Sequence, residues 1–285
     1  MKKTSIVLIT SNEESNIDAC LQTLLYQTYP DYEILVIDAS EDTTVEKAAK
    51  YDKVKVIKSH KKGFGAQRNL GIKLSQGQYI AFTDADCRVP KDWLYKQVTY
   101  LEQNNAIGVG GNAYPPEDSP KIGKLIACLG YPAGGALGLD LQDSLSTCNA
   151  LFVKEALEYV HGFREDTQHG GEDTELCKRL KAQGYKLLIN LDSYIYHNTR
   201  TFKEFLHWNI RRGRAKYHLN KSIKQLLMPL SIFIYPFTLK YRKVFTKRKG
   251  LNLRYSSILF VVPTLFFLRQ IFMTYGWIQE ALQRQ

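Results

Sequence analysis

Two acidic side chains, one residue apart, are the first feature of this chain that could do chemistry. Asp84 and Asp86 lie in the segment FTDADCRVP, directly after the apolar run YIAF, which is typical of a buried strand. Residues i and i+2 of an extended chain project to the same side, so both carboxylates are expected to point the same way. Like charges this close disfavour each other unless a cation or a proton lies between them. The pair therefore predicts a bound cation or a shared proton.

The segments before this pair alternate between apolar strand-like runs and helical patterns. Strands are predicted at 6–9, 33–38, 54–57 and 79–86, with helical segments between them. Such alternation predicts an α/β fold with a mostly parallel sheet flanked by helices. In sheets of this kind, ligands bind at the carboxyl ends of the strands. Asp38 and the Asp84–Asp86 pair both fall at such ends, so we expect them to belong to one site.

Charge is distributed unevenly along the 285 residues, whose formal net charge is +11. Residues 1–198 carry a balance of −4, and residues 199–285 carry +15. The five cysteines (Cys20, Cys87, Cys128, Cys148 and Cys177) form no Cys-x-x-Cys pair. Their spacing predicts neither a zinc site nor a disulfide framework, and it favours a reducing compartment. The N-terminal apolar run is too short for a signal peptide and is interpreted as a first strand.

Several segments in order closely resemble the family 2 glycosyltransferases over roughly residues 4–200. SIVLITSNEE resembles the opening strand and nucleotide loop, and EILVIDAS the strand that ends in a base-binding acid. GFGAQRNLGIKLSQGQYIAFTDAD resembles the segment that leads into the Asp-x-Asp motif, and HGFREDTQHGGEDTEL the Gly-Gly-Phe and Glu-Asp motifs. The resemblance implies a GT-A fold and an inverting, metal-dependent transfer of sugar from a nucleotide.

The resemblance also implies roles for the acidic residues. Asp86 is the expected metal ligand, and Asp84 would contact ribose or metal-bound water. His197, in YIYHNTR, stands where many relatives supply a further ligand, although a histidine at a strand end can equally be structural. An imidazole ligand would favour Mn²⁺ over Mg²⁺. Asp173 would be the general base that takes the proton of the acceptor hydroxyl, with Glu172 as the fallback.

Contacts to the donor follow by position in the same motifs. The expected nucleotide-binding residues are Thr10, Ser11, Asn12, Glu14, Asp38, Arg68 and Asp84. Relatives commonly have Pro-Thr-Tyr-Asn at residues 9–12 and a second acid in place of Ala39, so this chain departs from the pattern. Uridine diphosphate is the default carrier, and guanosine stays open. Asn149 is expected near the donor sugar or the acceptor, or else is an ordinary turn residue.

The basic C-terminal part is expected to determine where the protein works. Trp208, Arg211, Arg212 and Arg214 resemble a helix that closes over the diphosphate in processive relatives; a solvated basic face or a membrane-surface patch are the alternatives. The apolar segments 226–239 and 258–268 are shorter than the about 20 residues that a spanning helix needs. With the basic stretch 240–255 between them, they predict attachment to an anionic membrane surface. A subunit interface in a homo-oligomer is the alternative, and no nucleic-acid-binding signature is found.

The predicted organisation is a catalytic domain at 1–200 and a basic, helical, membrane-associating region at 201–285. Residues 1–106 would form the nucleotide-binding half of the catalytic domain and 107–200 the acceptor-binding half. The expected function is transfer of a sugar, at the cytoplasmic face of the membrane, to a hydroxyl of a lipid-linked glycan or surface polysaccharide. Two alternatives remain: a polyprenyl-phosphate glycosyltransferase, and a partner subunit that binds the sugar nucleotide without catalysis.

Overall fold

The computed structural model describes residues 2–129, 144–166, 170–219, 253–254 and 256–283. Internal contacts divide the chain into two compact units. The sheet unit comprises Met1–Ala113, Asp140–Thr167 and Glu172–His197, and the helical unit comprises Tyr114–Leu139, Gln168–Gly171 and Asn198–Gln285. The helical unit therefore includes a segment from the middle of the chain, which the expected single boundary at residue 200 did not anticipate.

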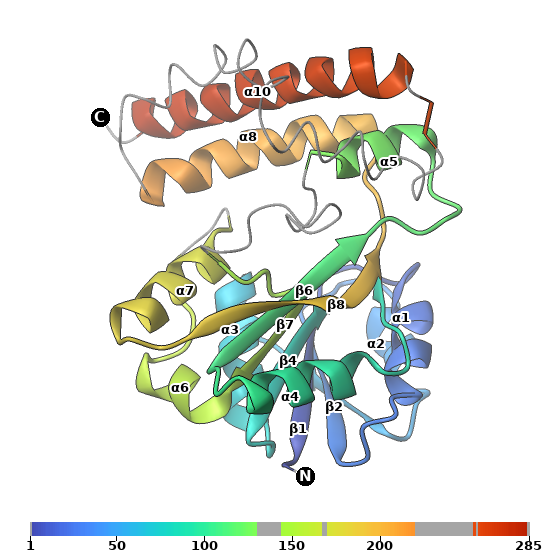
Figure 1. The fold of residues 1–285 in the computed structure, drawn as a ribbon, viewed down its shortest axis with the longest axis vertical. Helices are drawn as coiled ribbons and strands as arrows, with labels where there is room; N and C mark the ends of the chain where they lie inside the picture. The colour runs from blue at the N-terminus through green and yellow to red at the C-terminus, as the bar shows by residue number, and fades with distance from the viewer. Residues whose placement is uncertain (1, 130–143, 167–169, 220–252, 255, 284–285) are drawn as a thin grey trace. The chain divides into compact units, whose positions relative to one another are not determined.

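The first half of the sheet is parallel, as the alternating pattern predicted. Its strands, in spatial order, are β3 (Val54–Lys58), β2 (Tyr32–Asp38), β1 (Thr4–Thr10) and β4 (Tyr79–Asp84). The connections between them contain α1 (Ile17–Leu25), α2 (Thr44–Ala48) and α3 (Phe64–Leu74) (Figure 1). All seven residues of β1 are buried, as expected for a strand with neighbours on both edges and helices on its faces.

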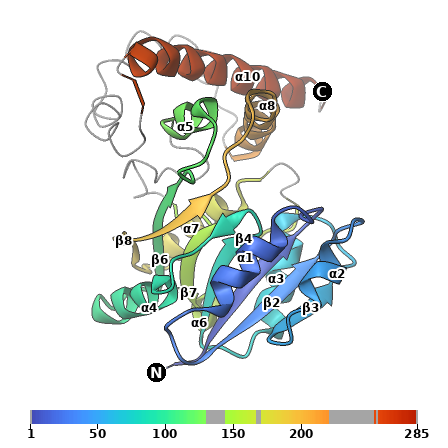
Figure 2. The ribbon, with the colours of Figure 1, turned by 90° about the vertical axis from the view of Figure 1, so that its right-hand side faces the viewer.

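The second half of the sheet is antiparallel where its pairing is given, so the expected mostly parallel sheet is in fact mixed. It continues from β4 through β7 (Asn149–Val153), β6 (Gly108–Tyr114), β8 (Leu187–His197) and β5 (Cys87–Arg88). The β4–β7, β6–β7 and β5–β8 pairs are antiparallel. This half is accompanied by α4 (Trp93–Gln103), α6 (Lys154–Tyr159) and α7 (Glu172–Ala182) (Figure 2).

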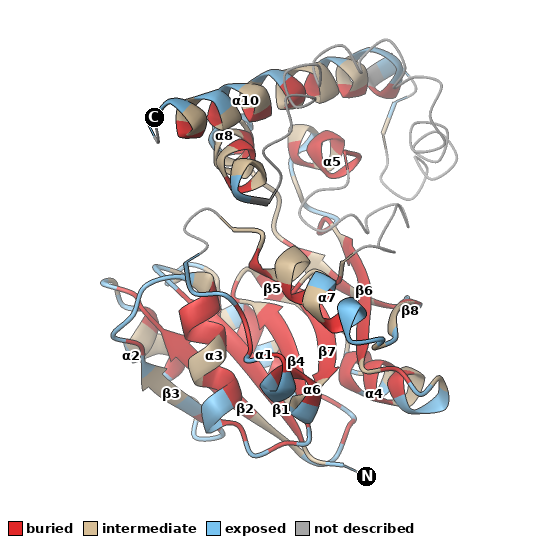
Figure 3. Cartoon of the chain, turned by 90° about the vertical axis from the view of Figure 1, so that its left-hand side faces the viewer, coloured by how far each residue is buried: buried red, intermediate tan, exposed pale blue. Residues whose placement is uncertain are grey.

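Apolar side chains from both halves of the sheet form one core. Val7, Leu35, Phe82 and Phe152 are each at most 1% exposed and belong to this cluster, and the central strands β1, β4 and β7 are drawn mostly as buried in Figure 3. A Cβ atom added to Gly71 of α3 would lie 2.3 Å from a Val7 methyl group, so the helix packs directly on β1. This packing sets the position of α3, which carries Arg68.

In the helical unit, α8 (Phe202–Leu219) lies beside α10 (Val262–Leu282), which follows a π-helical turn at Ser257–Val261 (Figures 1 and 2). A Cβ on Gly213 would lie 2.0 Å from the Met273 carbonyl oxygen, and one on Gly276 would lie 2.0 Å from that of Ile210. The backbones of the two helices therefore touch at these glycines. A smaller helix, α5 (Lys121–Ala127), adds Leu125 and Ile126 to the shared apolar cluster.

The last helix is longer than the sequence pattern predicted. Arg269 does not interrupt it: its guanidinium donates a hydrogen bond of 2.9 Å to the Leu129 carbonyl oxygen, and the helix continues to Leu282. Among the described residues, only Ile258–Leu282 is long and apolar enough to cross a membrane, and 33% of its apolar window is buried within the protein. Length and composition alone do not distinguish such a helix from a core helix. The predicted segment 226–239 and nearly all of the stretch 240–255 lie outside the described residues.

Candidate active site

The two aspartates of the opening motif lie close together, but they do not share a strand. β4 ends at Asp84, and Asp86 lies in the turn that leads to β5. The expectation that both project from one extended segment is therefore wrong. Their charges still interact: burial raises the pKa of Asp84, the Arg68 guanidinium opposes this, and the Asp86 carboxylate raises it further. A cation between them would relieve this repulsion.

His197 is brought to the aspartates by strand pairing. It is the last residue of β8, and its Cα pairs with that of Cys87 in β5, the residue after Asp86. Its Nε2 atom lies 3.5 Å from Oδ1 of Asp86, and the residue is 4% exposed. Oxygen and imidazole nitrogen donors therefore converge here, a donor set that fits a divalent cation such as Mn²⁺.

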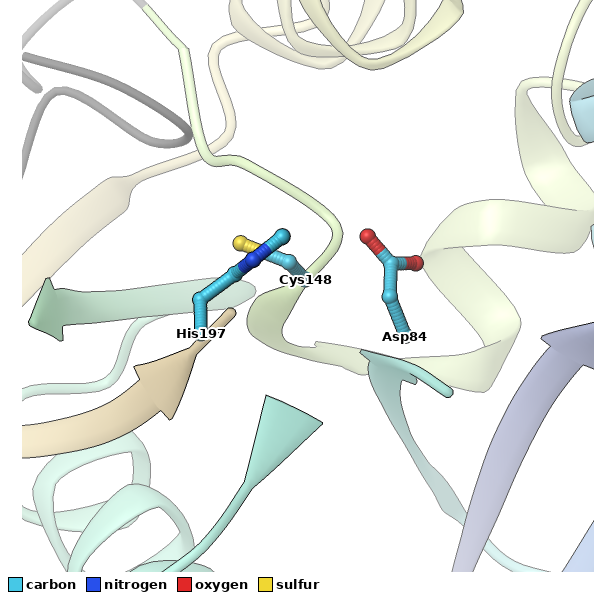
Figure 4. A group of neighbouring side chains, drawn as sticks. All are labelled: Asp84, Cys148 and His197. Atoms are coloured by element: carbon cyan, nitrogen blue, oxygen red, sulfur yellow. The ribbon is translucent and has the colours of Figure 1, made fainter. Parts of the chain in front are cut away.

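Three buried thiols surround the carboxylates, and the sequence analysis missed all of them. The ligand atoms of Asp84, Cys148 and His197 lie within 4.8 Å of one another (Figure 4), as do those of Asp86, Cys87 and His197. The Cys20 thiol lies 3.6 Å from the Asp84 carbonyl oxygen. Burial, and then the nearby aspartates, raise the pKa of each thiol. Spacing along the chain gave no signal, because these cysteines come from separate elements.

Arg68 links the aspartates to the Glu-Asp motif. Its Nη1 donates to Oε1 of Glu172 at 2.6 Å, and its Nη2 lies 3.4 Å from Oδ1 of Asp84. The rings of Phe64 and Phe163 lie within 6 Å of the guanidinium, at 5.7 and 5.6 Å. The Arg68 side chain is 5% exposed. It is held by two carboxylates, which differs from the expected contact to base or phosphate.

The two acids of the Glu-Asp motif have different surroundings at the start of α7. Glu172 is 5% exposed and is paired with Arg68, so the structure argues against its expected role as a fallback base. Asp173 is half-buried, and its Oδ1 accepts a 2.6 Å hydrogen bond from the Thr174 amide. Burial lowers the pKa of Arg68, but the charges of Glu172, Asp84 and, third, Asp173 outweigh burial and raise this pKa. Asp173 is thus the more accessible of the two carboxylates.

The expected nucleotide loop is tied to the loop that follows β2. Oγ1 of Thr10 donates to Asp38 at 2.7 Å, and the Asn12 amide donates to Oγ of Ser40 at 2.8 Å. The Asp38 carboxylate is fully buried; hydrogen bonds from Ser40, Lys58 and Thr10 outweigh burial and lower its pKa. The structure thus encloses Asp38 and Thr10. The remaining expected contacts, Ser11, Asn12 and Glu14, are exposed.

Asn149 is a structural residue in this fold. Its Oδ1 accepts hydrogen bonds of 2.8 Å from the Trp93 indole and the Gln97 amide, and its Nδ2 donates to the Asn112 carbonyl at 2.8 Å. It is 1% exposed. The expected contact with donor sugar or acceptor is therefore not supported, because the oxygen and the nitrogen of the amide both bond to buried groups of the core.

The basic residues predicted to contact phosphate lie on α8 in the helical unit. The Arg212 guanidinium lies 4.5 Å from the centroid of the Trp208 ring, and Nη2 of Arg214 donates to Oε1 of Gln279 at 3.0 Å. Trp208 also packs against the apolar cluster of this unit. Arg211 is half-buried. The phosphate role of these residues stays a prediction.

Family models match most of the sheet unit. Residues 5–159 match the model of glycosyl transferase family 2, and residues 141–207 match that of the N-terminal domain of galactosyltransferase. Among solved structures, the chain resembles the mannosyltransferase PcManGT from Pyrobaculum calidifontis, determined in complex with GDP-Man and Mn²⁺. The TM-score is 0.70 at 17% identity, over 100% of this chain and 88% of that one.

Curated relatives agree with the family models. Glycosyltransferase AglE from Haloferax volcanii is 31% identical over 234 residues, which cover 74% of this chain and 72% of that protein. The glucosyltransferase WfgD from Escherichia coli, named UDP-Glc:alpha-D-GlcNAc-diphosphoundecaprenol beta-1,3-glucosyltransferase, is 31% identical over 43% of this chain and 50% of its own length. The chain therefore belongs to glycosyl transferase family 2, and it is a glycosyltransferase with the GT-A fold.

Proposed function

We propose that this protein transfers a sugar, with inversion, from a nucleotide sugar to a hydroxyl of a lipid-linked glycan or surface polysaccharide at the cytoplasmic membrane face. The observation that carries the proposal is the convergence of Asp84, Asp86 and His197 at the strand ends. The Arg68 bridge connects this cluster to the start of α7, where Asp173 lies. Metal-binding and proton-accepting groups are thus held within one network.

Asp86 and His197 are the residues that would hold a divalent cation, Mn²⁺ or Mg²⁺. Their oxygen and nitrogen donors are 3.5 Å apart and would both face such an ion after a small rotation. When bound, the cation supplies positive charge to the diphosphate that leaves the sugar. The structural neighbour PcManGT was solved in complex with GDP-Man and Mn²⁺, which supports the assignment.

Asp173 would act as the general base. The acceptor hydroxyl oxygen attacks the anomeric carbon, its proton passes to the Asp173 carboxylate, and the bond between the sugar and the diphosphate breaks. A single displacement of this kind inverts the anomeric configuration. Glu172 orients this end of α7 through its ion pair with Arg68, while the Asp173 carboxylate is half-buried and so more exposed than that of Glu172.

We propose uridine diphosphate as the carrier of the donor sugar. Guanosine diphosphate is the alternative, and the test must distinguish the two. The exposed residues Ser11, Asn12 and Glu14 would contact it at the carboxyl ends of β1 and β2. The relative WfgD is named for UDP-Glc, whereas PcManGT was solved with GDP-Man. The two names point to different bases, so a panel of donors is required.

A lipid-linked acceptor is supported by the helical unit and by one relative. The solvent-facing side of α10 exposes Ile271, Tyr275, Ile278 and Leu282, and Phe260 in the preceding turn is 69% exposed. Apolar side chains beside a basic segment favour the surface of an anionic bilayer. The acceptor named for WfgD is a diphosphoundecaprenol glycan, which is a substrate of this kind.

The proposal is tested by measuring release of nucleoside diphosphate from a panel of uridine and guanosine diphosphate sugars. The protein is assayed in detergent with Mn²⁺, with Mg²⁺ and with chelator, with and without lipid-linked acceptors. One donor is expected to be consumed in a metal-dependent way, and Asp86→Ala is expected to abolish this. Equal rates in Asp86→Ala and the wild type would contradict the metal role. A product in which the sugar is joined directly to a polyprenyl phosphate would show that the acceptor is the lipid phosphate and not a glycan hydroxyl.

A further inference from the structure

The metal-binding region contains sulfur donors that the proposed transfer reaction does not require. The Sγ atom of Cys148, a carboxylate oxygen of Asp84 and a ring nitrogen of His197 lie within 4.8 Å of one another (Figure 4). These three atoms form the first group of candidate ligands. Cys148 is 3% exposed and His197 is 4% exposed. The three side chains come from β4, from the turn before β7, and from the end of β8.

A second thiol lies near the same histidine. Cys87 forms a group with Asp86 and His197, whose ligand atoms also lie within 4.8 Å of one another. Its Sγ lies 3.8 Å from Oδ1 of Asp86. His197 therefore belongs to both groups, and each group adds a carboxylate and a thiol to it. This arrangement offers sulfur, nitrogen and oxygen ligands in one small volume.

Such a mixed donor set selects a different class of metal ion from a set of carboxylates alone. Mg²⁺ and Mn²⁺ prefer oxygen ligands, whereas thiolate sulfur selects zinc and similar soft ions. Zinc binds sulfur at about 2.3 Å and imidazole nitrogen at about 2.0–2.1 Å, so in a tetrahedral site two such ligand atoms lie about 3.6 Å apart. The ligand atoms here lie within 4.8 Å of one another, so each pair must approach by at most about 1.2 Å to hold the ion. The adjacent Asp86 carboxylate offers a fourth ligand, 3.5 Å from Nε2 of His197.

We propose that Asp84, Cys148 and His197 form a binding site for a thiophilic divalent cation of the zinc class. The ion bonds to the Cys148 sulfur, whose proton is released to solvent, and no electron is transferred. Because the ion uses His197 and the adjacent carboxylates, it excludes the activating Mn²⁺ or Mg²⁺. Binding of zinc does not depend on catalysis. Its competition with Mn²⁺ or Mg²⁺, however, rests on the proposed function. The transferase would therefore be inhibited by zinc through a thiolate ligand.

Binding of Co²⁺ to the full chain tests the site without requiring catalysis. Co²⁺ bound to a thiolate gives a charge-transfer absorption in the near ultraviolet, which oxygen and nitrogen ligands do not give. We expect this band in the wild type, its removal by added Zn²⁺, and its absence in Cys148→Ser. Loss of a group that only orients a metal ligand weakens metal binding about 10- to 100-fold. Because Cys148 is a direct ligand, Cys148→Ser should weaken Zn²⁺ binding by at least this much.

Cys177→Ser is the matched control. Cys177 is also a fully buried thiol of the sheet unit, but it belongs to neither group, and its sulfur accepts a 3.2 Å hydrogen bond from the Leu145 amide. This variant should keep the absorption band. A band of full intensity in Cys148→Ser, or no band in the wild type, would overturn the proposal.

X-ray absorption of the zinc-loaded wild type provides a test that does not depend on how the variant folds. A sulfur neighbour at about 2.3 Å is expected, and a shell of oxygen and nitrogen alone at about 2.0–2.1 Å would refute the site. Competition is measured by electron paramagnetic resonance, which detects free Mn²⁺. Added Zn²⁺ should release Mn²⁺ from the protein and so increase this signal. Zinc bound through sulfur without Mn²⁺ release would refute the competitive part. A protein that passes these tests but transfers no sugar would contradict only the proposed function.

Discussion

The sheet unit and the helical unit each gather like charges, but of opposite sign. In the sheet unit, Asp84, Asp86 and Asp173 lie near one another, and the charge of Asp86 helps to raise the pKa of Asp84. In the helical unit, burial and the neighbouring Arg212 and Arg269 lower the pKa of Lys216 to about 8. Clusters of one sign are costly unless a ligand of the other sign binds. The first cluster thus suits a cation, and the second suits a phosphate or an anionic lipid.

The two units also hold their functional groups in place by different means. Strand pairing in the sheet unit brings His197 next to the residue after Asp86, so backbone hydrogen bonds hold the His197 and Asp86 side chains close together. In the helical unit, α8 and α10 touch through Gly213 and Gly276, and a hydrogen bond of 2.9 Å joins Nε2 of His218 and Oε1 of Glu280.

The largest effect is expected at Asp173. Asp173→Asn removes the proton acceptor but keeps the shape of the side chain. The rate of sugar transfer should therefore fall about 10²- to 10⁴-fold, while donor binding is retained. Turnover is measured with the identified donor and acceptor, and binding by calorimetry. Glu175→Gln, on the same helix in an ion pair with Arg179, is the control. A loss below tenfold in Asp173→Asn would assign the base elsewhere.

The buried ion pair of the sheet unit should matter most for stability. Arg68→Met leaves Glu172 buried without its cation, and Oε2 of Glu172 already has no hydrogen-bond partner within the described part of the chain. The free energy of unfolding should fall by about 3–5 kcal/mol, measured by urea denaturation. Arg164→Met removes an exposed arginine paired with Asp166 and should cost at most about 1 kcal/mol. Equal losses in the two variants would show that burial is not the deciding factor.

The close helix contact should be the sensitive point of the helical unit. A methyl group in Gly276→Ala would meet the Ile210 carbonyl, so the helices must separate, at a cost of about 1–3 kcal/mol. Faster hydrogen exchange of the α8 and α10 amides is the expected readout. Lys203→Ala, at an exposed position of α8, should leave exchange unchanged. Unaltered exchange in Gly276→Ala would mean that the two helices do not pack so closely.

The smallest effect is expected from a single apolar side chain at the membrane surface. Phe260→Ala removes part of the exposed apolar surface beside α10 and should lower partition into anionic vesicles by about tenfold or less. Vesicle sedimentation measures it. Tyr26→Ala removes an aromatic ring that is 77% exposed in the sheet unit and is the control. An equal decrease in both variants would show that the helical unit is not the membrane-binding part.

Local patterns in the sequence were enough to identify the parallel strands and the motif order. The runs that end in Asp38 and Asp84 are strands in the structure, because four to seven buried apolar residues between turns favour that conformation. The antiparallel second half was not predicted, since Gly108–Tyr114 and Asn149–Val153 have no clear period and depend on each other for pairing. The partners of Asn149 and Arg68 were also missed, because they lie far away in sequence.

The sequence by itself determined the family, the position of the carboxylates at strand ends and the basic C-terminal part. These follow from short-range order: motif spacing, apolar runs and charge counts. Only the tertiary structure decided that Arg68 pairs with Glu172, that Asn149 is enclosed, and that Cys148 lies beside Asp84 and His197. Such contacts join residues that are distant along the chain. Sheet pairing and core packing create these contacts, and no local pattern encodes them.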